Sequence, residues 1–148
     1  MVKFLQFTAI IVSALALIPS GAHLAALSNK IALPPEQYFT VQAIYRGWAF
    51  LGALWPAALL ANAGLAYIVR AQPVPLWLAV AAAFCFAVMI VIFMLWTFPA
   101  NQATENWTSV PADWRELRKQ WEYSHAVNTL IVFAALCLST LSVVTADR

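Results

Sequence analysis

The chain has 148 residues, of which 64% are hydrophobic and only 9% are charged, and its formal net charge is +2. A soluble domain carries about 25% charged residues, so this composition excludes a protein whose whole surface faces water and predicts one embedded in a lipid bilayer. The few charges form no basic run with interleaved aromatic residues, which excludes a nucleic-acid-binding protein.

Four apolar segments predict four membrane-spanning helices, because a span needs about 20 apolar residues. The first covers residues 4–27 and begins like a signal peptide, but its apolar run is longer than in such peptides, so we expect it to be retained. The second is expected over residues 39–70. The third is expected over residues 74–98 and ends before Pro99, because proline disfavours helix in the residue that precedes it.

The fourth span is expected over residues 124–144, and an amphipathic extension of the same helix begins near residue 114. One stripe of this helix, at the 3.6-residue period, contains Trp114, Leu117, Trp121, His125 and Asn128. The sequence therefore predicts an all-α integral membrane protein with one domain, residues 1–148. Its expected architecture is an up-down-up-down four-helix bundle with both termini on the same side.

The distribution of Lys and Arg bears on the orientation in the membrane. The side opposite the termini carries slightly more of them, which by itself favours that side as cytoplasmic. Most of these cations belong to the amphipathic helix, however, and nearly all the acidic residues lie on the same side. We therefore expect cytoplasmic termini and a location in a bacterial inner membrane.

The predicted topology brings four polar residues to one membrane face. His23 lies near the end of the first span, and Arg46 lies near the start of the second. Asn101 follows the third span, and His125 opens the fourth. These points lie at one level in an up-down-up-down bundle, and polar groups in membrane helices are commonly functional. We therefore predict a site at this face, walled by Trp107, Trp114 and Trp121.

Two metal-based functions match single features of this site. Glu122 and His125 have the spacing of a di-iron carboxylate helix, but such a centre needs a second copy of the motif and two further carboxylates. His23 and His125 could together hold haem, although the sequence has no haem attachment motif. The candidate metal ligands are therefore Glu122, His125 and His23.

A third function is acid–base chemistry on a bound aromatic or phenolic compound. Histidine accepts a proton near neutral pH, asparagine and arginine stabilise an oxyanion, and tryptophans provide flat apolar walls. For this function we expect the substrate-binding residues to be His23, Arg46, Trp107, Trp114 and Asn128.

Three short motifs lie at the predicted span boundaries. They are Gln42-x-x-Tyr45-Arg46 at the start of the second span, Pro99-Ala100-Asn101 after the third, and Arg118-x-x-Trp121-x-x-x-His125 at the start of the fourth. Together with four spans in so short a chain, these motifs resemble the anthrone-oxygenase-like family of small membrane proteins. Many bacterial members of that family have no known reaction.

The resemblance implies that the protein oxidises an anthrone-like compound to a quinone without a metal or flavin cofactor. In that chemistry a base removes a proton from an activated carbon, and the resulting carbanion reacts directly with oxygen. By this resemblance His125 would be the base, and Asn101 and Trp121 would position the substrate. The substrate would be a lipophilic ring compound such as a polyketide or a quinone.

Three hypotheses therefore stand. A membrane enzyme predicts that His125 and Asn101 face a cavity between the helices. A non-catalytic accessory subunit would pack within a larger membrane complex or oligomer through small-residue patches such as residues 79–83, with its histidines satisfied by backbone groups. A haem or metal carrier requires both histidines within coordinating reach of one point.

Overall fold

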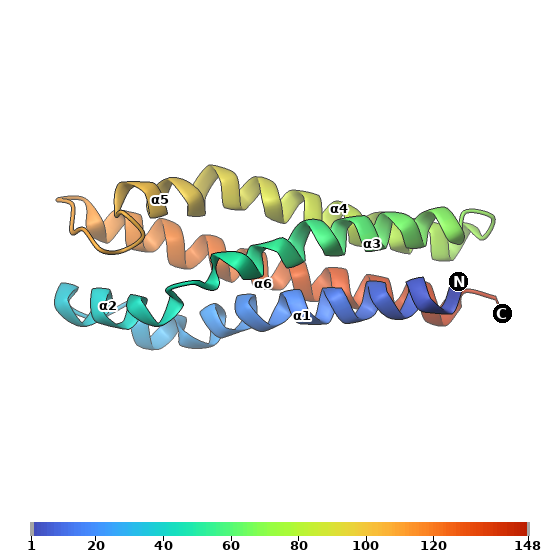
Figure 1. Ribbon diagram of the computed structural model, residues 1–148, viewed down its shortest axis with the longest axis horizontal. Helices are drawn as coiled ribbons and strands as arrows, with labels where there is room; N and C mark the ends of the chain where they lie inside the picture. Colours follow the sequence, from blue (N-terminus) through green and yellow to red (C-terminus); the bar gives the residue numbers. More distant parts are fainter. Residues whose placement is uncertain (1, 148) are drawn as a thin grey trace.

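The computed structural model describes residues 2–147, and it is helical throughout, with no strand in that range. Four helical segments are long and apolar enough to cross a membrane: Val2–Lys30, Trp48–Ile68, Pro73–Ala103 and Trp114–Thr145. They alternate in direction, and both ends of the chain lie at the same end of the bundle (Figure 1). The predicted four-helix membrane bundle is therefore confirmed. Met1 and Arg148, which the predicted domain includes, lie outside the described residues.

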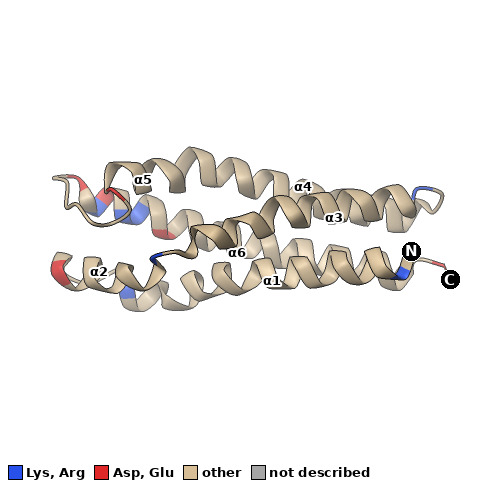
Figure 2. Ribbon diagram, viewed as in Figure 1, with Lys and Arg blue, Asp and Glu red and all other residues tan. Residues whose placement is uncertain are grey.

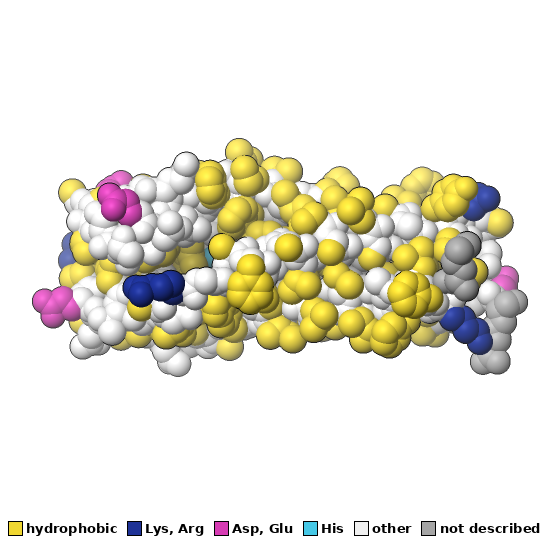
Figure 3. Space-filling model, in the orientation of Figure 1, with side chains coloured by type: hydrophobic (Ala, Val, Ile, Leu, Met, Phe, Trp, Pro, Cys, Tyr) yellow, Lys and Arg dark blue, Asp and Glu magenta, His cyan; other side chains and the backbone are white. Residues whose placement is uncertain are grey.

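The bundle packs through small residues and exposes large ones. The two inner clusters of the membrane section are Ala9, Ala61, Leu65, Ala66, Val69 and Ala79, and Ala16, Ala58, Phe86, Met89, Val132 and Ala135. Small side chains allow helix backbones to approach closely where lipid supplies no hydrophobic driving force. Large apolar side chains cover the outside (Figure 3), and charged residues gather at the two ends of the bundle (Figure 2). This distribution is that of a protein surrounded by lipid.

The second span is broken, whereas the sequence predicted one continuous helix over residues 39–70. It consists of α2 (Pro35–Gln42), the 3-10 turn η1 (Ala43–Tyr45), the 3-10 helix η2 (Trp48–Ala53) and α3 (Leu54–Ile68). Arg46 is extended, with ψ 126°, and Gly47 has φ +85°, a left-handed conformation that glycine adopts without steric cost. Pro56 lies in the first turn of α3, where a missing N–H is tolerated. The break leaves α2 beside the end of α1 (Val2–Lys30) rather than in line with α3 (Figure 1).

The third helix does not end before Pro99, so that prediction was wrong. It continues from α4 (Pro73–Ile92) through the π-helical turn η3 (Phe93–Thr97) into α5 (Phe98–Ala103). Proline lacks an N–H, and its ring crowds the carbonyl four residues earlier. The wider π turn directly before Pro99 accommodates both effects. As a result, Asn101 lies on a helix instead of beyond its end.

The last helix, α6 (Trp114–Thr145), is unbroken. The predicted amphipathic extension and the predicted span are therefore parts of one helix. Its inward stripe contains Trp114, Trp121, His125 and Asn128, all of them buried. The extension carries the first two of these residues beyond the membrane section to the polar end of the bundle, where α2 and α5 cover them.

Candidate functional site

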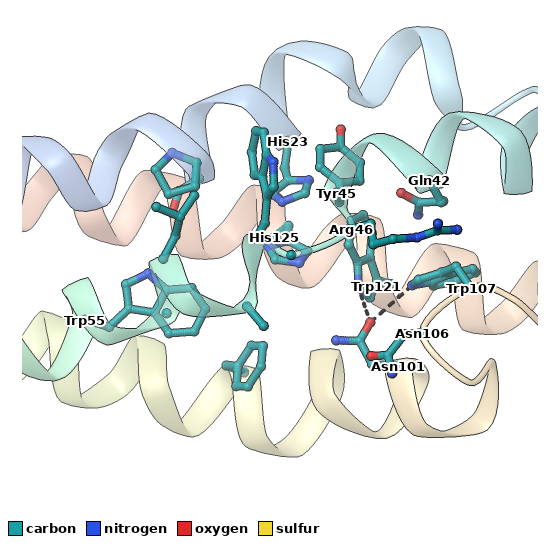
Figure 4. Close-up of a pocket in the computed structure, with 18 of the residues that line it drawn as sticks. His23, Gln42, Tyr45, Arg46, Trp55, Asn101, Asn106, Trp107, Trp121 and His125 are labelled. Atoms are coloured by element: carbon teal, nitrogen blue, oxygen red, sulfur yellow. Dashed lines mark hydrogen bonds between the residues drawn. The ribbon is translucent and has the colours of Figure 1, made fainter.

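A cavity of about 850 Å³ lies at the polar end of the bundle. Toward the middle of the bundle its walls are apolar and include Trp55, Ile90 and Phe93, whereas Gln42 and Arg46 line its outer part. Figure 3 shows a hollow near this end with a histidine at its bottom, and Figure 4 shows the lining side chains. The cavity is therefore open to the outside on one side of the bundle, where the apolar belt meets the polar end.

Two histidines from different helices stack on one wall of the cavity. His23 of α1 and His125 of α6 have ring centroids 4.1 Å apart and ring planes inclined by 26°. Both side chains are buried, and no hydrogen bond joins either ring to another residue of the range 2–147; the buried Nδ1 of His23 is without a partner. At this separation two imidazolium rings would repel each other, so at most one of the two rings carries a positive charge.

Aromatic rings surround the histidine pair. Trp121 packs against both rings, with centroid distances of 4.3 Å to His125 and 4.9 Å to His23. Tyr45 lies 4.3 Å from His23 and 5.9 Å from Trp121. The imidazoles are thus held by ring packing rather than by hydrogen bonds, and their nitrogen atoms, apart from the buried Nδ1 of His23, are left for a ligand.

Asn101 fixes two tryptophans of the site. Its Oδ1 accepts a hydrogen bond from Trp121 Nε1 at 2.8 Å and another from Trp107 Nε1 at 3.1 Å (Figure 4). Both lone pairs of that oxygen are therefore used, and the amide nitrogen makes no hydrogen bond within residues 2–147. The sequence predicted that Asn101 positions the substrate directly. The structure assigns its oxygen to the indoles and leaves only the Nδ2 group for a ligand.

The loop after α5 holds Trp107 in a strained conformation. Glu105, Asn106 and Trp107 have φ values of 49°, 56° and 66°, and each left-handed non-glycine residue costs about 1–2 kcal/mol. Thr104 offsets part of this cost, because its Oγ1 accepts the Trp107 N–H at 3.1 Å. This strained backbone turns the Trp107 indole inward, where the residue is only 7% exposed.

Two of the predicted substrate-binding residues lie elsewhere than expected. Trp114 is buried behind the cavity, with its ring 6.3 Å from that of Tyr38, and does not line it. Asn128 is buried deeper in the bundle and also does not line the cavity, and both of its side-chain polar atoms lack a partner among the described residues. Arg46 lines the cavity but is exposed at its mouth.

Glu122 does not lie with the histidines as a metal ligand. Its Oε1 is 2.9 Å from Lys30 Nζ and accepts a hydrogen bond from the Tyr38 hydroxyl at 2.9 Å. Arg118 lies four residues before Glu122 on α6, but its side chain donates to the Leu33 carbonyl at 2.7 Å. Within residues 2–147 no group of three or more His, Cys, Asp or Glu could hold a metal ion.

The histidine pair is also poorly arranged for haem or for one metal ion. The lone pairs of an imidazole lie in the plane of its ring, so two stacked rings direct them side by side rather than toward one point. A ligand set needs converging lone pairs at about 2 Å from the metal. The metal and haem hypotheses therefore lack the geometry that they require.

Sequence reasoning missed Lys30, Tyr38 and Tyr45. Lys30 follows the first span, where a cation ordinarily reaches the headgroups, yet it is only 2% exposed. Burial, reinforced by the Glu122 carboxylate, raises the pKa of Tyr38 well above its ordinary value, so this phenol keeps its proton and donates it. Tyr38 and Gln42 are four residues apart on α2, and Gln42 Nε2 donates to the Tyr38 hydroxyl at 2.6 Å. This four-residue spacing in the sequence could have indicated that the two side chains are in contact.

The chain was compared with known families, proteins and structures. No family model, curated protein or solved structure matches it. What the chain does must therefore be argued from the cavity and the side chains that line it.

Proposed function

We propose that the protein binds a lipophilic aromatic compound in this cavity and oxidises it with molecular oxygen, with His125 as the base. The observation that carries the proposal is the stacked pair of His23 and His125, without hydrogen-bond partners in the described chain, on the wall of a cavity lined by aromatic rings. The motif resemblance to anthrone-oxygenase-like proteins points to the same chemistry.

The size and lining of the cavity support a ring compound as the ligand. Sites for small molecules usually have volumes of about 300–1,000 Å³, and this cavity has about 850 Å³. Trp55 and Phe93 at one end and Trp107 and Trp121 at the other offer flat apolar surfaces. A fused aromatic system of three rings fits such a space.

The position of the opening supports access from the membrane. The hollow lies between the break in the second span and the η3–α5 segment, beside the apolar belt (Figures 1 and 3). Met94 and Leu51 line the cavity at this level, and Met94 is 52% exposed. A compound dissolved in the bilayer reaches the histidines without crossing water.

The reaction balances with oxygen as the only oxidant. An anthrone carries a methylene between two rings, and His125 accepts one of its protons while the electron pair stays on carbon as an enolate-like carbanion. The carbanion gives two electrons to O₂ and forms a C–O bond, and the proton returns from His125 to yield a hydroperoxide. Loss of water from the hydroperoxide leaves the quinone carbonyl.

The other lining residues have roles in the same scheme. The Nδ2 group of Asn101 and the guanidinium of Arg46 face the cavity as donors for the developing oxyanion. His23 stacks on His125, and the two rings share the positive charge that the transferred proton brings. The accessory-subunit hypothesis required histidines satisfied by backbone groups, and the unpartnered rings favour the enzyme instead.

We further propose that the protein lies in a bacterial inner membrane with cytoplasmic termini, because the cations at the opposite end belong mostly to the amphipathic helix and lie among nearly all the acidic residues. The cavity then opens near the opposite leaflet. A reporter enzyme fused after residue 147, active only in the periplasm, is expected to be inactive; activity there would reverse the orientation.

Purified protein in mild detergent tests the function. We expect it to convert anthrone to anthraquinone, followed by absorbance, and His125→Ala to lower the rate by at least about 100-fold, the usual contribution of a general base. Tyr123→Ala is the matched control, since Tyr123 is on the same helix and 53% exposed. Equal rates in wild type and His125→Ala would rule out His125 as the base. A Soret band in the purified protein would instead support a haem carrier.

A further inference from the structure

Three charged side chains are buried directly behind the wall of the cavity. They are Lys30 of α1 with Arg118 and Glu122 of α6, with relative exposures of 2%, 8% and 1%. Within residues 2–147 no other Lys, Arg, Asp or Glu side chain is buried. We refer to these three residues as the buried charge cluster. Because it contains two cations and one anion, it carries a net positive charge.

The ammonium of Lys30 lies one ring layer away from the histidines. Its Nζ is 4.7 Å from the ring centroid of Tyr45 and 5.0 Å from that of Trp121. Both of these rings also contact His23, and both residues line the cavity. Aromatic rings screen a charge far less than water does, so the field of Lys30 reaches a ligand in the cavity.

Stability alone does not account for this cluster. Replacing a buried ion pair by apolar residues of similar size is often neutral or stabilising, because the pair must first be stripped of water. The guanidinium of Arg118 meets only the Leu33 carbonyl and the rings of Tyr38 and Trp114, and Glu122 Oε2 has no partner among the described residues. Ionisable groups kept inside a membrane protein at such cost commonly serve its function.

We infer that the buried charge cluster makes the cavity selective for ring compounds that bind as anions, namely phenolates and enolates, and that Lys30 is its specificity-determining residue. This inference rests on the binding site of the proposed function, but not on the oxidation. Lys30 acts through the Tyr45 and Trp121 rings and does not touch the ligand. When a phenol ionises in the cavity, its O–H bond breaks, the electron pair stays on oxygen, and the proton leaves for the buffer.

The charged and titratable groups that line the cavity do not cancel this preference for anionic ring compounds. Arg46 and Glu105 line the mouth with opposite charges, and both are exposed. The other titratable side chains of the lining are His23, His125 and Tyr45. All five stay unchanged in the variants below, so a difference between variants reports the buried charge cluster.

The test uses 2-naphthol, whose absorbance distinguishes naphthol from naphtholate, with 2-methoxynaphthalene as a probe of similar shape that cannot ionise. The ratio of naphtholate to naphthol affinity is measured on full-length protein in detergent. We expect Lys30→Gln to lower this ratio by about tenfold, because it removes the nearer cation. We expect Glu122→Gln to raise the ratio by about tenfold, because it leaves both cations unopposed.

The opposite signs separate an electrostatic role from a structural one. If the ion pair merely held the fold, both substitutions would weaken binding of both probes alike. Lys119→Gln is the matched control for loss of a cation, since Lys119 is exposed on the same end of α6 in a surface pair with Glu116; it should leave the ratio unchanged. If Lys30→Gln does not fold, the double variant Lys30→Gln/Glu122→Gln is used instead. It keeps the net charge of the cluster through Arg118, so its ratio should stay within about threefold of the wild-type ratio, and a larger change would overturn the electrostatic role.

The outcomes distinguish this inference from the proposed function. One outcome is that 2-methoxynaphthalene binds and that the ratio of naphtholate to naphthol affinity is the same in wild type, Lys30→Gln and Glu122→Gln. This outcome would overturn the role of the cluster and leave the binding site standing. Shifts of the same sign in both variants would overturn it as well. Failure of both probes to bind wild-type protein would overturn the binding site and this inference together.

Discussion

The two halves of the bundle differ in the regularity of their helices and in how their buried polar groups are satisfied. Near the termini the helices are regular, and Asn62 donates to Ser13 Oγ and to the Ala58 carbonyl. In that half only Asn62 Oδ1 and Ser139 Oγ are buried without a partner in the described chain.

The half that holds the cavity departs from regular structure at several points. It contains the break at Gly47, the π turn, three consecutive left-handed residues and the buried charge cluster. Unpartnered buried atoms there include an imidazole nitrogen of His23 and a carboxylate oxygen of Glu122. Departures from local rules concentrate where a protein binds or reacts, so we assign the proposed function to the half that holds the cavity and a supporting role to the terminal half.

The largest expected effect comes from breaking the buried ion pair. Glu122→Leu leaves the Lys30 ammonium buried without its carboxylate, and we expect it to lower the free energy of unfolding by about 3–5 kcal/mol. Denaturation in detergent measures the change. Glu116→Leu is the control, because Glu116 is 74% exposed in its pair with Lys119, and it should cost less than about 1 kcal/mol. Equal losses of stability in the two variants would mean that the pair of Lys30 and Glu122 is in effect hydrated.

Removing a core side chain from the terminal half should affect stability alone. Leu65 is fully buried, and Leu65→Ala is expected to lower the free energy of unfolding by about 3 kcal/mol through the cavity that it leaves. The affinity for 2-methoxynaphthalene, measured below the unfolding transition, should not change. Weaker binding in this variant would show that the two halves are coupled, against the division drawn above.

Filling the cavity should instead affect ligand binding and leave the stability of the fold unchanged. Gly52 lines the cavity, and a Cβ added there meets nothing nearer than Trp55 at 4.0 Å. Gly52→Phe therefore has room for its Cβ, and we expect its ring to occupy part of the cavity and to cause at least a 100-fold loss of probe affinity, or about 2.7 kcal/mol. Gly21→Phe, on α1 with open space around its Cβ and outside the lining, controls for the added ring. Retained affinity in Gly52→Phe would place the ligand elsewhere.

The smallest expected effect concerns the fixed indoles. Asn101→Ala frees Trp107 and Trp121, and we expect the probe affinity to fall about tenfold, or about 1.4 kcal/mol, with altered tryptophan fluorescence. Asn101→Asp keeps an acceptor for both indoles but loses the Nδ2 donor. Near wild-type fluorescence with reduced turnover in Asn101→Asp would separate the two roles of Asn101, namely holding the two indoles and donating from Nδ2. Unchanged probe affinity in Asn101→Ala would show that Asn101 has neither role.

The sequence predicted the spans well because hydrophobic length and span number determine the topology. The same topology correctly implied that His23 and His125 approach the same level. It did not reveal the break at Gly47, since Gly47 is the only glycine or proline among residues 43–51, and an isolated glycine is tolerated within a helix. The 3.6-residue period places Trp114, His125 and Asn128 on one stripe of α6, but it does not say which neighbour covers each part of that stripe. Lys30 was missed because its partner, Glu122, is 92 positions further along the chain.

The cluster of Ala16, Ala58, Phe86, Met89, Val132 and Ala135 closes the bundle beneath the cavity, and each of these residues is fully buried. Within the described residues the cavity therefore has no continuation through the bundle toward the end that holds the termini. Under the proposed function, a proton released in the cavity would return to the side from which the ligand came, and no charge would be carried across the apolar section. Chemistry in this cavity would be electroneutral across the bilayer, so the membrane potential would neither drive it nor oppose it.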